Sequence, residues 1–231
     1  MTEILRDRGL VLQTFDHAET DRIVSLLTEG RARLEVLAKG ARRLERTSGA
    51  ALDLLNLVEV LYYRRRSGLH LLREASLIRS FPKIRADLPR LEAGLRLAQW
   101  ARDLVPREIP DPRPFRLSLS FLLALEGGAP PGTFLCAYKI RLLSVLGYRP
   151  VLQGCLVCGG KEGLTWSAER GGFLCRGCGG SGEEVPPRVQ RTMEALLRLP
   201  LAALGRLHIP EDDLRTMDAM LTAFRAAQVA L

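Results

Sequence analysis

Four cysteines in two closely spaced pairs are the residues whose type and spacing most clearly indicate chemistry. Cys155 and Cys158 form one Cys-x2-Cys pair, Cys175 and Cys178 form the other, and 16 residues separate the pairs. Two thiolates three residues apart on a tight turn can both reach one tetrahedral ion at about 2.3 Å. The spacing therefore predicts a zinc-ribbon-like module that holds one Zn²⁺ per chain. Because four protein ligands leave no open position for water, this metal should be structural.

Two other uses of these cysteines compete with metal binding. A pair of disulfides is disfavoured, because the first seven residues carry acids where a secretory signal would be basic and then apolar. A redox Cys-x-x-Cys site is weaker still, since the motif occurs twice and has no βαβ setting. The fifth cysteine, Cys136, lies in an apolar helical segment, and we expect it in the core.

Arginine is the second feature that indicates chemistry. Only four of the 34 basic residues are lysine, and the net charge is +8. Residues 31–46 hold six bases and two acids, and residues 64–90 hold eight bases and two acids. Guanidinium groups bind phosphate in a bidentate manner, so positive charge concentrated in the first 90 residues suggests a nucleic-acid site. The alternative is a basic surface that only aids solubility. The candidate nucleic-acid-binding residues are Arg31, Arg33, Lys39, Arg42, Arg43, Arg64, Arg65 and Arg66.

The segment from Arg22 to Arg46 has to position the first of these arginines. Ala32, Leu34 and Val36 fall on one face of an extended chain, and Arg31, Arg33 and Glu35 fall on the other. This alternation favours a half-buried hairpin turning at residues 28–30. Because arginine, alanine, leucine and glutamate also form helices well, a short amphipathic helix that ends at Gly40 is an equal alternative from local pattern.

Residues 1–80 have the pattern of a small β domain. Strands are predicted near residues 10–15, 22–28, 31–38, 56–63 and 69–78, and the turn before the last strand carries Arg64, Arg65 and Arg66. Five strands with basic turns fit an OB-fold, which binds oligonucleotides. Tyr62 and Tyr63 lie beside the arginine triplet, where an exposed ring could stack on a base, although such aromatic residues are more often core.

From Asp87 onward, hydrophobic spacing predicts helices near residues 87–105, 115–126, 133–146, 188–199 and 211–231. The fold class is therefore α+β. The expected organisation is an OB-fold at 1–80, a helical domain at 81–150, the zinc module at 151–184, and the helical domain continued at 185–231.

Catalysis is not expected. The chain has no phosphate-binding glycine loop, and no Ser–His or Cys–His arrangement stands out. Asp16, Glu19 and Asp21 form an acidic cluster, but two-metal nuclease chemistry would need more carboxylates around them. No uncharged run approaches the roughly 18 apolar residues of a membrane span, so we expect a cytoplasmic, nucleoid-associated protein with no membrane partner.

Three segments resemble the bacterial recombination-mediator family RecO. They are Gly9–Leu12 with Glu19–Val24 and Leu27–Thr28, the Ala38–Arg43 sequence AKGARR, and Arg141–Pro150, which leads into Cys155-x-x-Cys158. The resemblance spans nearly the whole chain. It implies an N-terminal OB-fold and so favours the hairpin over the helix.

The resemblance also implies a non-enzymatic function. Members of this family bind single- and double-stranded DNA and anneal complementary strands. The resemblance implies partnership with RecR and with the acidic C-terminal tail of single-stranded-DNA-binding protein, so that RecA, an indirect partner, can load on DNA at gaps and breaks. For the groove that holds this tail, the helix at 133–146 offers only Lys139 and Arg141. The remaining alternatives are a protein–protein adaptor that binds an acidic tail rather than DNA, a metal-dependent nuclease, and a zinc module that contacts DNA directly.

Overall fold

The computed structural model describes residues 3–41, 47–66 and 68–228, and it divides into two compact units. Unit 1 is Met1–Gly127 and unit 2 is Gly128–Leu231. The boundary falls inside the predicted helical domain at 81–150. Its helices before Gly127 belong to the unit that contains the barrel, and its helix after Gly128 belongs to the unit that contains the four cysteines. Each unit is described below by itself.

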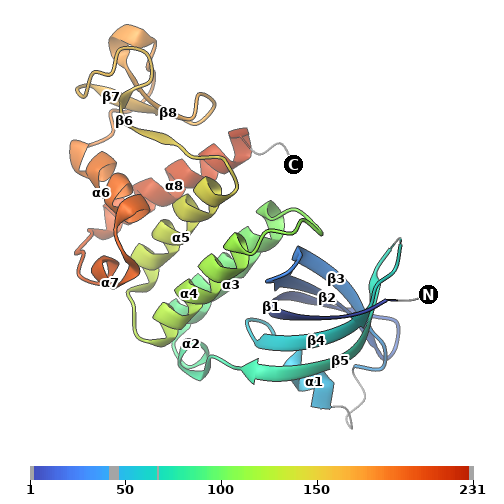
Figure 1. Cartoon of the computed structure of the whole chain (residues 1–231). Coiled ribbons are helices and arrows are strands. Elements are labelled where there is room, and N and C mark those ends of the chain that lie inside the picture. Colours follow the sequence, from blue (N-terminus) through green and yellow to red (C-terminus); the bar gives the residue numbers. More distant parts are fainter. Residues whose placement is uncertain (1–2, 42–46, 67, 229–231) are drawn as a thin grey trace. The chain divides into compact units, whose positions relative to one another are not determined.

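Unit 1 is built around a closed five-stranded barrel (Figure 1). Its strands are β1 (Ile4–His17), β2 (Asp21–Thr28), β3 (Ala32–Ala38), β4 (Leu57–Tyr63) and β5 (His70–Arg79). The long β1 pairs with β4 through its first half and with β2 through its second half, with a register shift between Val11 and Gln13. The barrel closes where β3 pairs in parallel with the start of β5, at Val36–His70 and Leu37–Leu71. The predicted OB-like barrel is thus confirmed.

The alternating pattern in β3 explains why this segment is a strand. Ala32, Leu34, Val36 and Ala38 are buried, and the side chains between them are partly exposed. Because one face of the strand lies on the apolar core with Val24, Leu26 and Val60, a helix at this position would expose half of these side chains. The hairpin prediction is correct, and the helix alternative is wrong.

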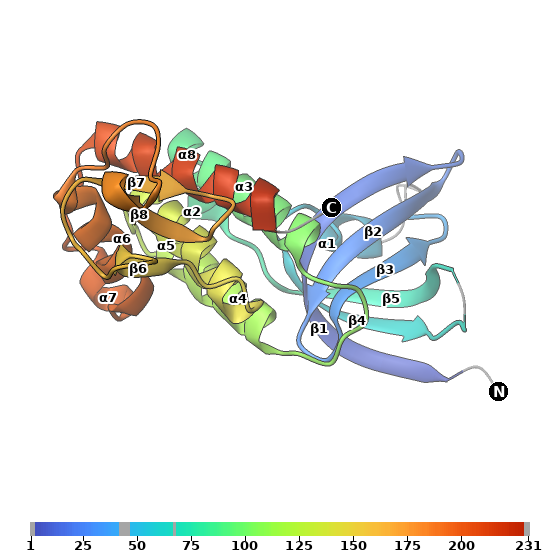
Figure 2. The same ribbon diagram turned by 90° about the horizontal axis from the view of Figure 1, so that it is seen from above.

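Short helices and two longer ones complete unit 1. They are α1 (Thr47–Ala51), α2 (Pro82–Arg85), α3 (Leu88–Leu104) and α4 (Arg113–Glu126). The side chain of Asp87 caps α3 by accepting a hydrogen bond of 3.0 Å from the backbone N–H of Arg90. Helix α3 packs on β1 and on α4. Seen from above, β4 ends and β5 begins at the end of the barrel where β1 also begins (Figure 2).

Unit 2 combines helices with a small sheet. Helix α5 (Pro131–Val145) packs against α6 (Pro187–Arg198) and α8 (Glu211–Gln228), and α7 (Leu201–Leu204) follows α6. Helix α5 is buried on nearly every side, including Cys136, as its apolar sequence predicts. The sheet has the order β6 (Val151–Cys155), β8 (Gly172–Cys175), β7 (Leu164–Ser167), and a 3-10 turn at Arg176–Cys178 follows it. Among the described residues, no helix is long and apolar enough to cross a bilayer.

Candidate metal centre and basic hollow

The four predicted cysteines lie together in unit 2. Their sulfur atoms are all within 4.8 Å of one another, and Sγ of Cys158 lies 3.7 Å from Sγ of Cys175. The edge of a tetrahedron with metal–sulfur bonds of 2.3 Å is about 3.8 Å, so this separation suits a single tetrahedral ion. The residues present therefore fit a bound metal, and the soft donor set favours zinc or another thiolate-binding ion.

Both pairs of cysteines are held by similar turns. Gly159 donates its backbone N–H to the carbonyl of Cys155, and Gly179 donates to the carbonyl of Arg176. Both glycines have left-handed φ values, 72° and 89°, which residues with a Cβ rarely adopt. Backbone N–H groups of Cys158 and Cys175 also point at the sulfur of Cys155 and lower its pKa to about 6. This thiol is therefore prepared to bind as a thiolate.

The second candidate site is a pair of adjoining hollows on unit 1, called here the basic hollow. The first, with a volume of about 390 Å³, and the second, of about 430 Å³, share Arg65, Arg66 and Glu108. The charged residues that line the two together are Arg33, Arg64, Arg65, Arg66, Arg107, Glu3, Glu35 and Glu108. Five guanidinium groups thus face three carboxylates, which leaves an excess of two positive charges for an anion.

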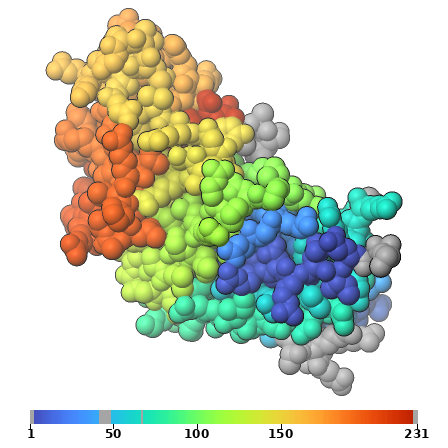
Figure 3. All heavy atoms as spheres, viewed as in Figure 1, coloured from blue at the N-terminus to red at the C-terminus, as the bar shows by residue number. Residues whose placement is uncertain are grey.

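The arginine turn between β4 and β5 supplies three of these groups. Arg64, Arg65 and Arg66 are all exposed, and in Figure 3 the turquoise atoms of this turn project beside the dark blue N-terminal strand. The backbone N–H of Arg64 donates to the carbonyl of Glu3 at 2.9 Å. The backbone N–H of Arg65 donates to Nδ1 of His70 at 3.1 Å. The base of the turn is therefore anchored while its side chains stay accessible.

A segment after α3, residues 105–108, crosses the start of β3 and is called here the strap. Arg33 donates its N–H to the carbonyl of Pro106, and Glu108 donates its N–H to the carbonyl of Arg33. The guanidinium of Arg107 then lies 2.8 Å from the carboxylate of Glu35. Burial and the nearby Arg107 both lower the pKa of Arg33. The guanidinium of Arg33 lies 3.9 Å from the same Glu35 carboxylate. Two guanidinium groups therefore share one carboxylate, and the surplus positive charge favours a bound anion.

The predicted DNA-binding residues do not all converge. Arg33, Arg64, Arg65 and Arg66 line the basic hollow, but Arg31 and Lys39 do not. Lys39 follows the far end of β3, about 20 Å along the strand from Arg33 at 3.3 Å per residue. Arg42 and Arg43 lie outside the described residues. Sequence reasoning missed Arg107, because no local pattern shows that the strap crosses β3.

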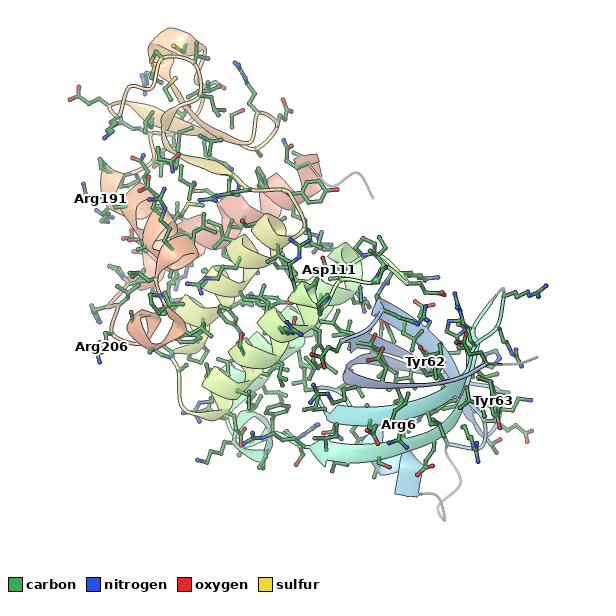
Figure 4. The ribbon with its side chains drawn as sticks, viewed as in Figure 1. Arg6, Tyr62, Tyr63, Asp111, Arg191 and Arg206 are labelled. Atoms are coloured by element: carbon green, nitrogen blue, oxygen red, sulfur yellow. The ribbon has the colours of Figure 1, made fainter. Side chains whose placement is uncertain are left out.

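The two tyrosines beside the arginine turn have different environments, although they occupy adjacent positions of β4 (Figure 4). Tyr62 is only 1% exposed and its ring stacks on His70, with ring centres 5.5 Å apart. It therefore belongs to the barrel core, and stacking on a base is excluded for it. Tyr63 is partly exposed.

Lys139 and Arg141 are not available for an acidic tail. Lys139 is buried and forms an ion pair with Asp218. Arg141 donates from Nε to the carbonyl of Leu196 at 2.8 Å, and from Nη2 to the carbonyl of Leu199. Both cations therefore hold helices of unit 2 together, and these two candidates for the tail groove are engaged in contacts within the fold.

A five-stranded barrel with a basic hollow, joined to a helical unit with a four-cysteine site, defines the class as an OB-fold protein with a metal-binding module. Residues 1–81 match the family described as recombination protein O N terminal, and residues 85–231 match recombination protein O C terminal. The chain belongs to the RecO family.

Individual relatives agree with this assignment. The chain is 35% identical to the DNA repair protein RecO of Anaeromyxobacter sp. (strain K), over 94% of this chain and 88% of that protein. It is 35% identical to the DNA repair protein RecO of Rubrobacter xylanophilus, over 88% of this chain and 85% of that protein. It is 31% identical to the DNA repair protein RecO of Geobacter sulfurreducens, over 98% of this chain and 93% of that protein. Membership of this family supports a role in DNA repair and recombination.

Proposed function

We propose that this protein is a recombination mediator that binds single- and double-stranded DNA through the basic hollow and anneals complementary strands. With RecR, it would help RecA load on DNA coated by single-stranded-DNA-binding protein, in the cytoplasm at the nucleoid. The observation that carries the proposal is the convergence of Arg33, the arginine turn and Arg107 from three separate segments.

The physical basis of annealing is charge neutralisation. Two phosphate backbones repel each other, and a protein that offsets part of their charge lowers the barrier to pairing without covalent chemistry. Guanidinium groups suit this task because each binds phosphate in a bidentate manner. Contacts to phosphate carry no sequence information, so binding should tolerate any sequence.

The direct test compares two charge-reversed variants by fluorescence anisotropy with a single-stranded oligonucleotide. Arg65→Glu/Arg66→Glu should weaken binding by about tenfold or more, and should flatten the slope of log affinity against log salt by roughly 1.4 for two lost phosphate contacts. The matched control is Arg191→Glu/Arg206→Glu, which reverses two exposed arginines of unit 2 (Figure 4). Equal losses in both variants would mean that net charge, and not the basic hollow, governs binding.

A non-enzymatic role is part of the proposal. The carboxylate of Asp16 lies 3.3 Å from Nε of Arg22, and that of Asp21 accepts the N–H of Gly40 at 2.8 Å. Within the described ranges, the four-cysteine cluster is the one group of three or more close metal-ligating side chains. Incubation of labelled DNA with Mg²⁺ or Mn²⁺ should leave the DNA intact, and cleavage that co-purifies with the protein would contradict the proposal.

A second binding role has its own support in unit 2. A cavity of about 130 Å³ is lined by Arg149, Arg198, Glu194, Leu197 and Val151 among others, so its charged side chains leave an excess of one positive charge, and the side chain of Val151 is 43% exposed. Two guanidinium groups beside apolar side chains suit a peptide that ends in acidic and apolar residues, such as the tail of single-stranded-DNA-binding protein. Arg149→Glu should abolish binding of a synthetic acidic tail peptide and leave DNA affinity unchanged. The opposite result would make this cavity a DNA contact.

The metal is proposed to be Zn²⁺, held by Cys155, Cys158, Cys175 and Cys178. Four thiolates would close its coordination shell, so its contribution is to the fold of the module and not to a reaction. Elemental analysis of protein purified without added metal should give one zinc per chain. Substoichiometric zinc with intact folding would contradict this assignment.

A further inference from the structure

His70 is the most buried ionisable side chain near the basic hollow. It begins β5, is 2% exposed, and lies opposite Val36 where β3 and β5 close the barrel. One face of its ring stacks on Tyr62 at an interplanar angle of 28°. The ring therefore has little freedom to rotate, and the directions of its two nitrogen atoms are set by the core.

The hydrogen bond from Arg65 defines the protonation of this ring. Nδ1 of His70 accepts the backbone N–H of Arg65, so Nδ1 carries no proton. In a neutral imidazole the proton then lies on Nε2. Nε2 is 3.3 Å from Oε1 of Glu108, although the alignment falls short of a hydrogen bond. In this tautomer the acceptor nitrogen, Nδ1, faces the arginine turn, and the donor nitrogen, Nε2, faces the strap.

These two neighbours both line the basic hollow. The arginine turn supplies Arg65 and Arg66, and the strap supplies Arg107 and Glu108. Glu108 has a left-handed φ of 55°, which is a strained conformation for a residue with a Cβ, so packing must hold the strap in place. The two segments are about 40 residues apart in sequence, and His70 lies between them in space.

We propose that His70 is a positioning residue for the binding of phosphate: it fixes the arginine turn relative to the strap, so that guanidinium groups from both segments engage one nucleic-acid backbone. This inference rests on the proposed DNA-binding function of the basic hollow. His70 does not contact the strand itself. It acts by removing the freedom of Arg65 and its neighbours, which lowers the entropy lost when a strand binds.

Three substitutions separate this role from simple core packing. His70→Asn retains an acceptor close to the position of Nδ1, His70→Gln moves the acceptor toward the position of Nε2, and His70→Phe keeps a ring against Tyr62 but has no acceptor. We expect His70→Phe and His70→Gln to weaken single-strand binding about fivefold and to flatten the salt slope by roughly 0.7, the loss of one phosphate contact. His70→Asn should bind within about twofold of the wild type, because the Arg65 N–H keeps its partner.

Melting temperatures measured alongside identify a purely structural effect. If affinity follows melting temperature across the three variants, with no rescue by asparagine, the positioning role is overturned. Arg65→Glu/Arg66→Glu is measured in the same series. If it binds weakly while all three His70 variants bind like the wild type, the positioning role fails and the proposed function stands. If Arg65→Glu/Arg66→Glu also binds like the wild type, the positioning role and the proposed DNA-binding function both fail.

The wild-type protein provides a measurement that needs no variant to fold. Nitrogen-15 NMR of His70 near neutral pH should show the tautomer protonated at Nε2, and the Arg65 amide should exchange slowly with solvent. A proton on Nδ1, or fast exchange at Arg65, would overturn the inference.

Discussion

The cations that line the basic hollow are all arginines, and the difference between arginine and lysine is testable at the residue scale. Arg65→Lys/Arg66→Lys keeps both charges but removes the planar fork that binds two phosphate oxygens at once. We expect single-strand affinity to fall about threefold with an unchanged salt slope, since the number of neutralised phosphates stays the same. Anisotropy titrations over a range of salt concentrations measure both quantities. A flattened slope would show instead that the lysines no longer reach the phosphates.

Arg141 illustrates the other use of arginine in this chain. Its guanidinium is held by two backbone carbonyls in unit 2, and burial lowers its pKa. Arg141→Met keeps the apolar stem and leaves both carbonyls without this donor. The free energy of unfolding should fall by about 2 kcal/mol, as expected for lost hydrogen bonds to a charged donor. Urea denaturation measures this, with the exposed Arg206→Met as control; a change below about 0.5 kcal/mol would mean that water replaces the contact.

At the scale of elements, the end of β3 depends on a carboxylate. Asp21 accepts the N–H of Gly40, where φ is 63°, and this hydrogen bond lowers the pKa of Asp21. A lowered folded-state pKa means that the stabilisation is present above the unfolded-state pKa of about 3.9 and is lost as pH falls through the folded value. Thermal melts from pH 6 to pH 2 should show a smaller acid-induced loss in Asp21→Asn than in the wild type. An identical pH dependence would exclude this role.

The cysteine module is the second element with a clear test. Its sheet consists of three short strands of five, four and four residues, and Trp166 packs on Phe173 and Phe224 with ring centres 5.1 Å and 6.0 Å away. Removal of the metal by a chelator, or Cys175→Ser, should therefore lower the melting temperature of unit 2 markedly. Affinity for DNA measured well below that temperature should change less than twofold, an expectation that follows from placing the phosphate contacts on unit 1. A large loss of DNA affinity with little loss of stability would make the module a direct DNA contact.

At the scale of the whole molecule, charge sets how the protein responds to salt. The net charge is +8, and five arginines line the basic hollow. If about five phosphates are engaged, log affinity should fall against log salt with a slope of roughly −3.5 on single strands and −4.5 on duplex. The rate of annealing of two complementary strands should decline over the same salt range. Annealing that persists after binding is lost would show that neutralisation by this surface is not the mechanism.

The sequence alone determined the features that depend on neighbouring residues. Alternation in residues 31–38 made β3 one of two equal interpretations, because a strand places successive side chains on opposite faces while the same residue types also form helices well. The two Cys-x2-Cys pairs predicted the ligand cluster, since each pair is completed within a single tight turn. The RecO resemblance decided between strand and helix where local propensity left both open, and the barrel agrees with it.

Only the tertiary structure decided which charged groups meet. The parallel pairing of β3 with β5 and the crossing of the strap bring Arg33 and Arg107 to the arginine turn from distant segments, and no local pattern encodes such contacts. The same is true of Lys139 and Arg141, which look available in sequence but are held by groups more than 50 residues away. A side chain's type follows from the sequence, whereas its availability to a ligand depends on which partners the folded chain places beside it.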